Sequence, residues 1–160
     1  MLKLGLDTES LHLWFQNKRM DIFGFIEKAH ELGFDGVMIN ILKDYNLDPE
    51  WGTLMNNDPA HLKRVRDLLE SYHMYAELAT KGITKEHLLK VLDVAEALAA
   101  DIIRTYIPIT LNPLASRATG GEGKYDQAKV RGDFDPAVFD EAAMSLRQII
   151  PELKKRRIRL

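Results

Sequence analysis

The stretch DIFGFIEKAHELGFDGVMIN, from Asp21 to Asn40, contains a helix signal and a strand signal with only two residues between them. Its first part places apolar residues at helical spacing, namely Ile22, Phe25, Ile26, Ala29 and Leu32. Asp21 can cap the start of this helix, and Gly33 can end it. The run Gly36–Asn40 is short and mostly apolar, as is typical of a strand. A helix that leads almost directly into a strand predicts an α/β fold.

The same alternation extends over the rest of the chain. We expect strands at 2–7, 36–40, 74–80 and 101–107, and helices at 21–33, 58–72, 84–100 and 135–156. Asp58 and Thr84 are expected to cap their helices, and Pro151 to kink or break the last one. Residues 157–160 begin a fifth strand. Regular alternation predicts parallel βα units, here within a single domain that spans 1–160.

The connections between these elements differ in length according to their direction. Helix-to-strand links are very short, as at Phe34–Asp35, whereas strand-to-helix links are long, at about 8–20, 41–57 and 108–133. Long links in a compact domain usually carry function. In a (β/α)8 barrel they lie at the carboxyl ends of the strands, where the active site is found. The chain is therefore predicted to form half of a (β/α)8 TIM barrel, with four βα units and the start of strand five.

Polar side chains interrupt the predicted strands at four positions: Asp7, Asn40, Glu77 and Arg104. Side chains alternate along a strand, so the helix-facing side of the first strand is expected to consist of Leu2, Leu4 and Leu6. Glu77 and Arg104 would bury a charge against apolar groups if they faced the helices, which is costly. They are therefore expected to point into the barrel interior from neighbouring strands.

Composition excludes several classes of function. The net charge is −2, with 22 basic and 24 acidic residues, so no overall positive field attracts nucleic acid or an anionic membrane. No run of about 18 apolar residues is present to span a membrane, and the start of the chain is not typical of a signal peptide. Cysteine is absent, which is compatible with the reducing cytoplasm, the location that we expect.

Two segments, IEKAHELGFDGVMIN (26–40) and VLDVAEALAADIIRTYI (91–107), resemble the xylose-isomerase-like TIM barrel superfamily, which includes sugar phosphate isomerases and epimerases. The resemblance implies that this chain is the N-terminal half of such a barrel. It also implies a divalent metal of the Mn or Mg class, whose ligands come mainly from strands five to eight. No metal ligand is therefore assigned in this chain. Met38 stands where many members have Glu, so the role of that Glu is not carried over.

Several residues are candidates for a site of this kind. The substrate-binding candidates are Asp7, Glu9, His12, Asn40, Glu77, Arg104, Arg117 and Lys124, and the catalytic candidates are His12 and Glu77. A neutral imidazole can bind a hydroxyl group or transfer a proton, although His12 could equally belong to loop packing. Arg104 could hold a carboxylate or phosphate through its planar fork, or form a structural ion pair with Glu77.

The long fourth loop contains Arg117, Lys124 and several glycines, in the sequence RATGGEGKYDQ (117–127). It could close over an anionic or polyhydroxyl substrate, or it could be an exposed loop or an oligomer contact. Trp14, Phe15, Tyr45 and Trp51 also lie in the predicted long loops, as apolar floors for a sugar or as packing residues.

Three functions fit these features. The first is the substrate-orienting part of a sugar or sugar phosphate isomerase or epimerase, acting by metal-assisted proton transfer next to a carbonyl and inactive alone. The second is a non-catalytic half-barrel that self-associates or pairs with a complementary subunit. The third, a nucleic-acid enzyme, is disfavoured by the charge. An open arc of sheet leaves unpaired edges, so we expect a copy of the chain, another polypeptide or a longer parent chain to complete the barrel.

Overall fold

The computed structural model describes residues 2–41, 47–48, 50–106 and 136–160, and its centre is a parallel β-sheet. The four strands are β1 (Gly5–Asp7), β2 (Gly36–Ile41), β3 (Tyr75–Lys81) and β4 (Ile103–Tyr106). They lie in the order β1-β2-β3-β4, and each pairs in parallel with the next. Consecutive parallel strands joined by helices are the arrangement of a (β/α) barrel, so the predicted fold class, half of a TIM barrel, is confirmed.

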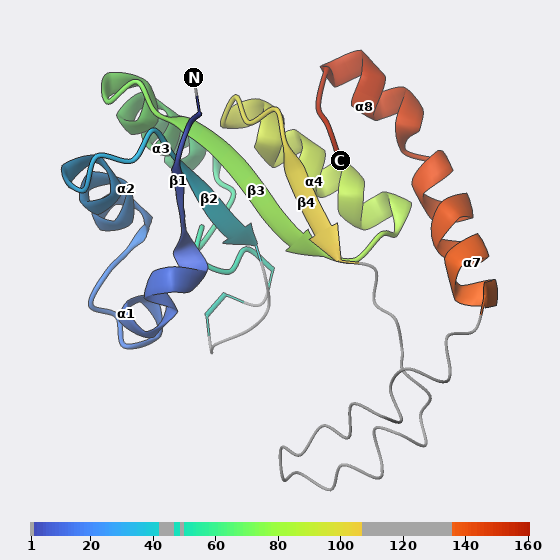
Figure 1. Cartoon of the computed structure of the whole chain (residues 1–160), viewed down its shortest axis with the longest axis horizontal. Helices are drawn as coiled ribbons and strands as arrows, with labels where there is room; N and C mark the ends of the chain where they lie inside the picture. Colours follow the sequence, from blue (N-terminus) through green and yellow to red (C-terminus); the bar gives the residue numbers. More distant parts are fainter. Residues whose placement is uncertain (1, 42–46, 49, 107–135) are drawn as a thin grey trace, which may run out of the picture.

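Helices fill the connections between the strands. The described helical elements are η1 (Thr8–Leu11), α1 (His12–Gln16), α2 (Ile22–Glu31), α3 (Pro59–Ser71), α4 (Lys85–Ala97), α7 (Pro136–Arg147) and α8 (Ile150–Arg156). Figure 1 shows α3 and α4 behind the sheet and α2 beside β1, while the opposite face, called here the open face, is turned toward the viewer. All four strands run toward the side on which α1 lies. None of the helices in these ranges is long and apolar enough to cross a bilayer.

The hydrophobic core lies between the sheet and its helices. Val37, Ile39 and Leu78 are fully buried from the strands, and they meet Phe25, Val65 and Leu92 from the helices within one cluster. The side chains of β2 and β3 therefore alternate as predicted, with the apolar residues facing the helices. Leu6 packs against this core, but Leu2 and Leu4 are 85% and 57% exposed, contrary to expectation. β1 begins only at Gly5 and is an edge strand, so the residues before it lie outside the packed layer.

The ends of the helices follow the predicted local signals in most places. The Asp21 side chain accepts a hydrogen bond from the Gly24 N–H at 2.9 Å, and the Thr84 hydroxyl accepts one from the His87 N–H at 3.3 Å. Asp58 occupies the cap position before α3, but its side chain makes no capping hydrogen bond. Pro151 lies in the first turn of α8, immediately after a break between α7 and α8. A proline needs no N–H partner at that position.

Where a fifth strand is predicted to begin, the structure has an isolated bridge instead of a strand. Arg159 forms a parallel bridge with Ile102, and its backbone exchanges 2.8 Å hydrogen bonds with Asp101 and Ile103. The preceding helix is anchored by Arg156, whose guanidinium contacts Asp93 at 2.5 Å and Glu96 at 3.2 Å on α4. The hydrogen bond with Asp93 is the main reason that the pKa of Arg156 is raised. The outer side of β4 is therefore partly occupied, while no strand in the described ranges pairs with the outer edge of β1.

Two glycines make room for one aromatic ring on the open face. A Cβ atom at Gly36 would lie 2.4 Å from the Tyr75 ring, and one at Gly5 would lie 2.6 Å from the Tyr75 hydroxyl oxygen. The ring therefore lies across β2 toward β1, at the amino ends of the strands. Lys3 lies above it, with Nζ 5.7 Å from the ring centroid. Burial is the main cause that raises the pKa of Tyr75, with a further contribution from the charge of Glu77.

The variant Gly36→Ala is expected to destabilise the fold by about 1–3 kcal/mol, since the added methyl group overlaps with the Tyr75 ring. In a Tyr75→Ala background the same substitution should cost less than half as much, because the overlapping ring is absent. Urea denaturation of the four proteins of this double-mutant cycle measures the coupling. Equal costs in both backgrounds would show that Tyr75 does not occupy this position.

Candidate functional site

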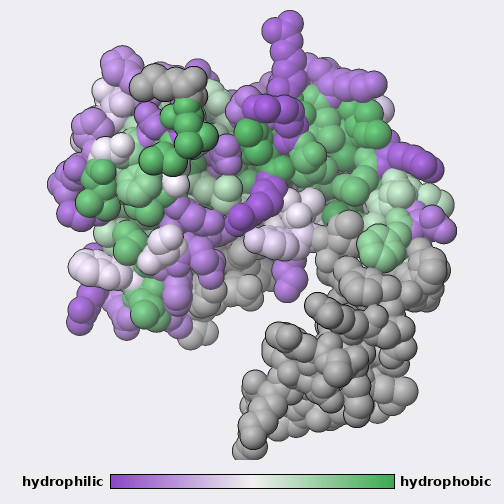
Figure 2. All heavy atoms as spheres, viewed as in Figure 1, coloured by the Kyte–Doolittle hydropathy of each residue, from purple (hydrophilic) through white to green (hydrophobic). Residues whose placement is uncertain are grey.

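The register of the strands arranges the side chains of the open face in rows. Asp7, Met38 and Glu77 form one row, and Asn40, Ala79 and Arg104 form the next toward the carboxyl ends. Lys81 and Tyr106 pair in a third row at the end of the sheet. In Figure 2, which views this face, hydrophilic side chains lie in the middle with hydrophobic side chains to either side. The carboxyl half of the open face is therefore the candidate site.

Asp7 is the most extensively bonded acidic side chain of this face. Its Oδ1 atom accepts hydrogen bonds from the Glu9 N–H at 2.9 Å and from Asn40 Nδ2 at 2.6 Å. Its Oδ2 atom contacts an Arg104 terminal nitrogen at 3.3 Å. Asp7 also caps η1, which begins at the next residue. Three donors on one carboxylate hold it in a fixed orientation.

A buried set of hydroxyl and amide groups continues from Asp7 below the surface of the site. The Thr8 hydroxyl oxygen accepts hydrogen bonds from the Asn40 backbone N–H at 3.0 Å and from its Nδ2 at 3.1 Å. The Thr53 hydroxyl donates to the Asn40 carbonyl oxygen at 2.9 Å. All three side chains are at most 4% exposed. They fasten η1 and the loop after β2 to the end of β2.

Thr8 and Thr53 were missed by the sequence analysis. Thr8 directly follows Asp7 at the end of a strand, and that position was a usable signal. Thr53 lies in a long loop, flanked by the buried residues Trp51 and Leu54, and nothing in the local sequence indicates its bond to Asn40.

Glu77 and Arg104 both lie on the open face, as expected, but they do not form an ion pair with each other. Arg104 lies opposite Ala79 and reaches Asp7, whereas Glu77 lies opposite Met38, one row lower. The difference arises from the stagger between β3 and β4, which places the two charges in different rows. Glu77 is half-buried and forms no ion pair with any residue in the described ranges.

His12 is the first residue of α1, close to the end of β1. Its Nδ1 atom lies 2.9 Å from the Glu9 carbonyl oxygen. A carbonyl can only accept, so Nδ1 carries the hydrogen, and in the neutral ring Nε2 is the basic nitrogen. The Glu9 side chain is exposed beside it. Arg117 and Lys124, the remaining candidates, lie outside the described residues.

The aromatic residues of the long loops do not act together. Phe15 and Trp51 are buried in the hydrophobic core, where Phe15 contacts Phe25 with ring centroids 5.7 Å apart. Trp14 is half-exposed, and Tyr45 lies outside the described residues. For Phe15 and Trp51 the packing interpretation is therefore correct.

The residues that the structure describes do not fit a metal ion. Within the described ranges no group of three His, Asp, Glu or Cys side chains is placed to bind one. Both carboxylate oxygens of Asp7 already accept hydrogen bonds, from Asn40 and Arg104. Glu77 has the apolar Met38 beside it, which supplies no oxygen or nitrogen ligand.

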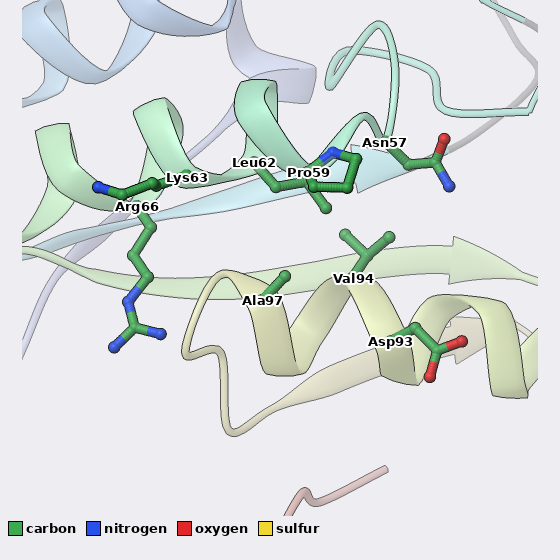
Figure 3. Close-up of a pocket in the computed structure, with 8 residues that line it drawn as sticks. All are labelled: Asn57, Pro59, Leu62, Lys63, Arg66, Asp93, Val94 and Ala97. Atoms are coloured by element: carbon green, nitrogen blue, oxygen red, sulfur yellow. The ribbon is translucent and has the colours of Figure 1, made fainter.

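A separate hollow of about 410 Å³ lies on the helical side, between α3 and α4. Figure 3 shows Leu62, Val94 and Ala97 facing one another across it, with Arg66 and Asp93 at its margins. Both of these margin residues already have ion-pair partners, Glu70 and Arg156 respectively. This hollow is therefore not part of the candidate site.

The variant Asn40→Asp is expected to destabilise the fold by about 2–3 kcal/mol at pH 7, because it removes two donated hydrogen bonds and places a second carboxylate beside Asp7. The pKa of the new carboxyl group should be raised by Asp7, so the penalty should shrink as the pH falls and the group is protonated. Urea denaturation of both proteins at pH 7 and pH 4.5 measures this. Asn57→Asp, at an exposed position, is the matched control. A penalty independent of pH would contradict the carboxylate contact.

No protein-family model matches the chain, and no curated protein matches it. Solved structures are similar in fold. A crystal structure of D-psicose 3-epimerase in the presence of D-fructose aligns with a TM-score of 0.62 at 13% identity. A D-psicose 3-epimerase with D-tagatose, from Clostridium cellulolyticum H10, aligns with a TM-score of 0.60 at 12% identity.

In both cases the alignment covers 98% of this chain but 50% of the other chain. The chain therefore spans about half the length of these two structures. At such identities the likeness concerns the fold alone, and it agrees with the half TIM barrel described above.

Proposed function

We propose that this chain is the substrate-orienting, N-terminal half of a sugar or sugar phosphate isomerase or epimerase. The observation that carries the proposal is the polar part of the open face, where Asp7 binds Asn40 and Arg104 and Glu77 lies in the same row as Asp7. Active sites of (β/α)8 barrels lie at this end of the strands. The fold likeness to two D-psicose 3-epimerase structures supports the same direction.

The geometry gives these residues different tasks in such a reaction. Asp7 is held by three donors, so it suits the orientation of substrate hydroxyl groups rather than proton transfer. Glu77 has no ion-pair partner among the described residues and is half-buried, as suits a group that accepts a proton from carbon next to a carbonyl. His12, with Nδ1 directed at Glu9, is the second candidate for proton transfer. In this proposal Asn40 positions Asp7.

A divalent metal of the Mn or Mg class is part of the family resemblance. The described residues do not fit such an ion, so the proposal assigns its ligands to the half that completes the barrel. When bound there, the ion would polarise the oxygens of the substrate. This chain contributes hydrogen bonds, charge and the shape of one side of the site.

The variant Glu77→Gln is expected to weaken ketose binding by the purified chain at least about fivefold, because a neutral amide is a weaker acceptor for hydroxyl groups than a carboxylate. NMR titration with D-fructose, D-tagatose and D-psicose measures binding through the backbone signals of Asp7, Asn40 and Ala79. Glu70→Gln, on the outer surface of α3, is the matched control and should bind as the unchanged chain does. No shift with any ketose would contradict a substrate-orienting role. Ketose turnover by the chain alone with added manganese would contradict the assignment of the metal ligands to another half.

The alternative of a half-barrel that works by association is favoured by the apolar surface at the two sides of the sheet. On the β1 side, Leu2 and Leu4 are exposed. On the β4 side, the exposed apolar residues are Phe139 and Met144 on α7, Ile150 on α8, and Leu160 after α8. Exposed apolar surface of this kind is typical of an interface.

Sedimentation of the purified chain is expected to show association, together with binding of a dye specific for apolar surface. The double variant Met144→Ser, Ile150→Ser should reduce both, because it removes apolar surface beside β4. Leu32→Ser, directly after α2, is comparably exposed but lies away from β4, and it should change neither. A monomer that binds no dye would remove the need for a partner.

A further inference from the structure

Three side chains at the carboxyl ends of β3 and β4 form a basic corner of the open face: Lys81, Arg104 and Tyr106. Lys81 pairs in register with Tyr106, and Arg104 lies one row below. Thr80, between Ala79 and Lys81, faces the helices, because its hydroxyl group lies 2.8 Å from His87 Nε2 on α4. Lys81 must therefore face the opposite way. Ile103 is buried on the helix side, so Arg104 also projects from the open face.

The two positive charges of this corner are only partly compensated. Lys81 is exposed and forms no ion pair with any residue in the described ranges. The Arg104 side chain is 43% exposed, and its contact with Asp7 is a single one at 3.3 Å. The Asp7 carboxylate keeps two shorter hydrogen bonds without it, from Glu9 and Asn40. Arg104 is thus not required to satisfy Asp7, and most of its N–H donors remain available to a ligand.

Tyr106 gives the corner one apolar wall. Its ring is half-exposed, and the centre of the Arg104 guanidinium lies 5.4 Å from the ring centroid. This contact restricts the orientation of the guanidinium plane without using its hydrogen-bond donors. A planar fork that is held in place, with a second cation in the neighbouring row, is suited to an anion with several oxygens.

We propose that Lys81, Arg104 and Tyr106 form a subsite for an anionic substituent of the substrate, a phosphate or a carboxylate group. The inference rests on the proposed function, since it specifies which sugars the site takes. Glu77 lies two rows below Lys81, and its charge disfavours an anion at that depth. The anionic end of the substrate is therefore held at the carboxyl edge, and its uncharged hydroxyl groups point toward Glu77 and Asp7.

Titration of the purified chain with inorganic phosphate and with acetate, at ionic strength kept constant with chloride, tests the subsite directly. The NMR signals of Lys81, Gly82 and Arg104 should shift with at least one of the two anions, and the stronger one identifies the substituent. Lys81→Met and Arg104→Met should each weaken its binding about tenfold, the loss of one charge-assisted hydrogen bond. Lys81→Arg keeps the positive charge and should retain most of the affinity for the anion. This retained binding would show that a substitution at position 81 leaves the fold intact.

Lys3→Met is the matched control. Lys3 is also on the open face, but it lies over Tyr75 at the amino end of the sheet. Its loss should change anion affinity less than twofold. No binding of either anion, or an equal loss in Lys3→Met, would overturn the subsite.

A comparison of D-fructose with D-fructose 6-phosphate separates this inference from the proposed function. We expect the phosphate ester to bind more tightly, and the advantage to disappear in Lys81→Met and Arg104→Met. Equal affinities for ester and free sugar would overturn the subsite and leave the sugar-binding role in place. Binding of inorganic phosphate without binding of either sugar would support the subsite and overturn the proposed function.

Discussion

The parallel pairing of β2 with β3 is the constraint on which both the core and the candidate site depend. Gly36–Ile41 pairs in register with Tyr75–Thr80. This register sends Ile39 and Leu78 to the helices and Met38 with Glu77 to the open face. A slip of one residue in either strand would exchange the two sides of that strand. Since it would bury Glu77 in β3 or expose Ile39 in β2, the hydrogen bonds that order the sheet also fix the polar face.

Those features that depend on short-range patterns could be predicted from the sequence. The spacing of Ile22, Phe25 and Ala29 marks a helix whose buried side is known before any contact is known. Asp21 and Thr84 cap their helices through bonds to residues three positions on, so the signal is entirely local. The placement of Asn40, Glu77 and Arg104 on the open face follows from alternation along the strands and from the cost of burying a charge. Four parallel strands, and the edge that carries the candidate site, could therefore be predicted from the sequence.

The hydrogen-bond and ion-pair partners of the polar residues could not be predicted from the sequence, because they depend on the stagger of the strands and the paths of the loops. Arg104 binds Asp7 although three strand spacings, about 14 Å, separate β1 from β4. Both side chains must therefore lean across the sheet, over the small side chain of Ala79 in the Arg104 row. Thr53 bonds to Asn40 only because the loop after β2 folds back on the end of its own strand. Neither contact produces a periodic pattern in the sequence from which it could be predicted.

Position along the strand explains why two carboxylates of one row differ. Asp7 lies at the end of β1, where the N–H groups of the next turn have no strand partner and are free to donate to it. Glu77 lies in the middle of β3, where the backbone groups around it are used by the ladders on both sides. The orientation of the Asp7 carboxylate at the strand end is thereby fixed by hydrogen bonds, while the Glu77 carboxylate in mid-strand can still accept hydrogen bonds from a ligand. Under the proposed function, this separates a group that orients hydroxyls from one that exchanges protons.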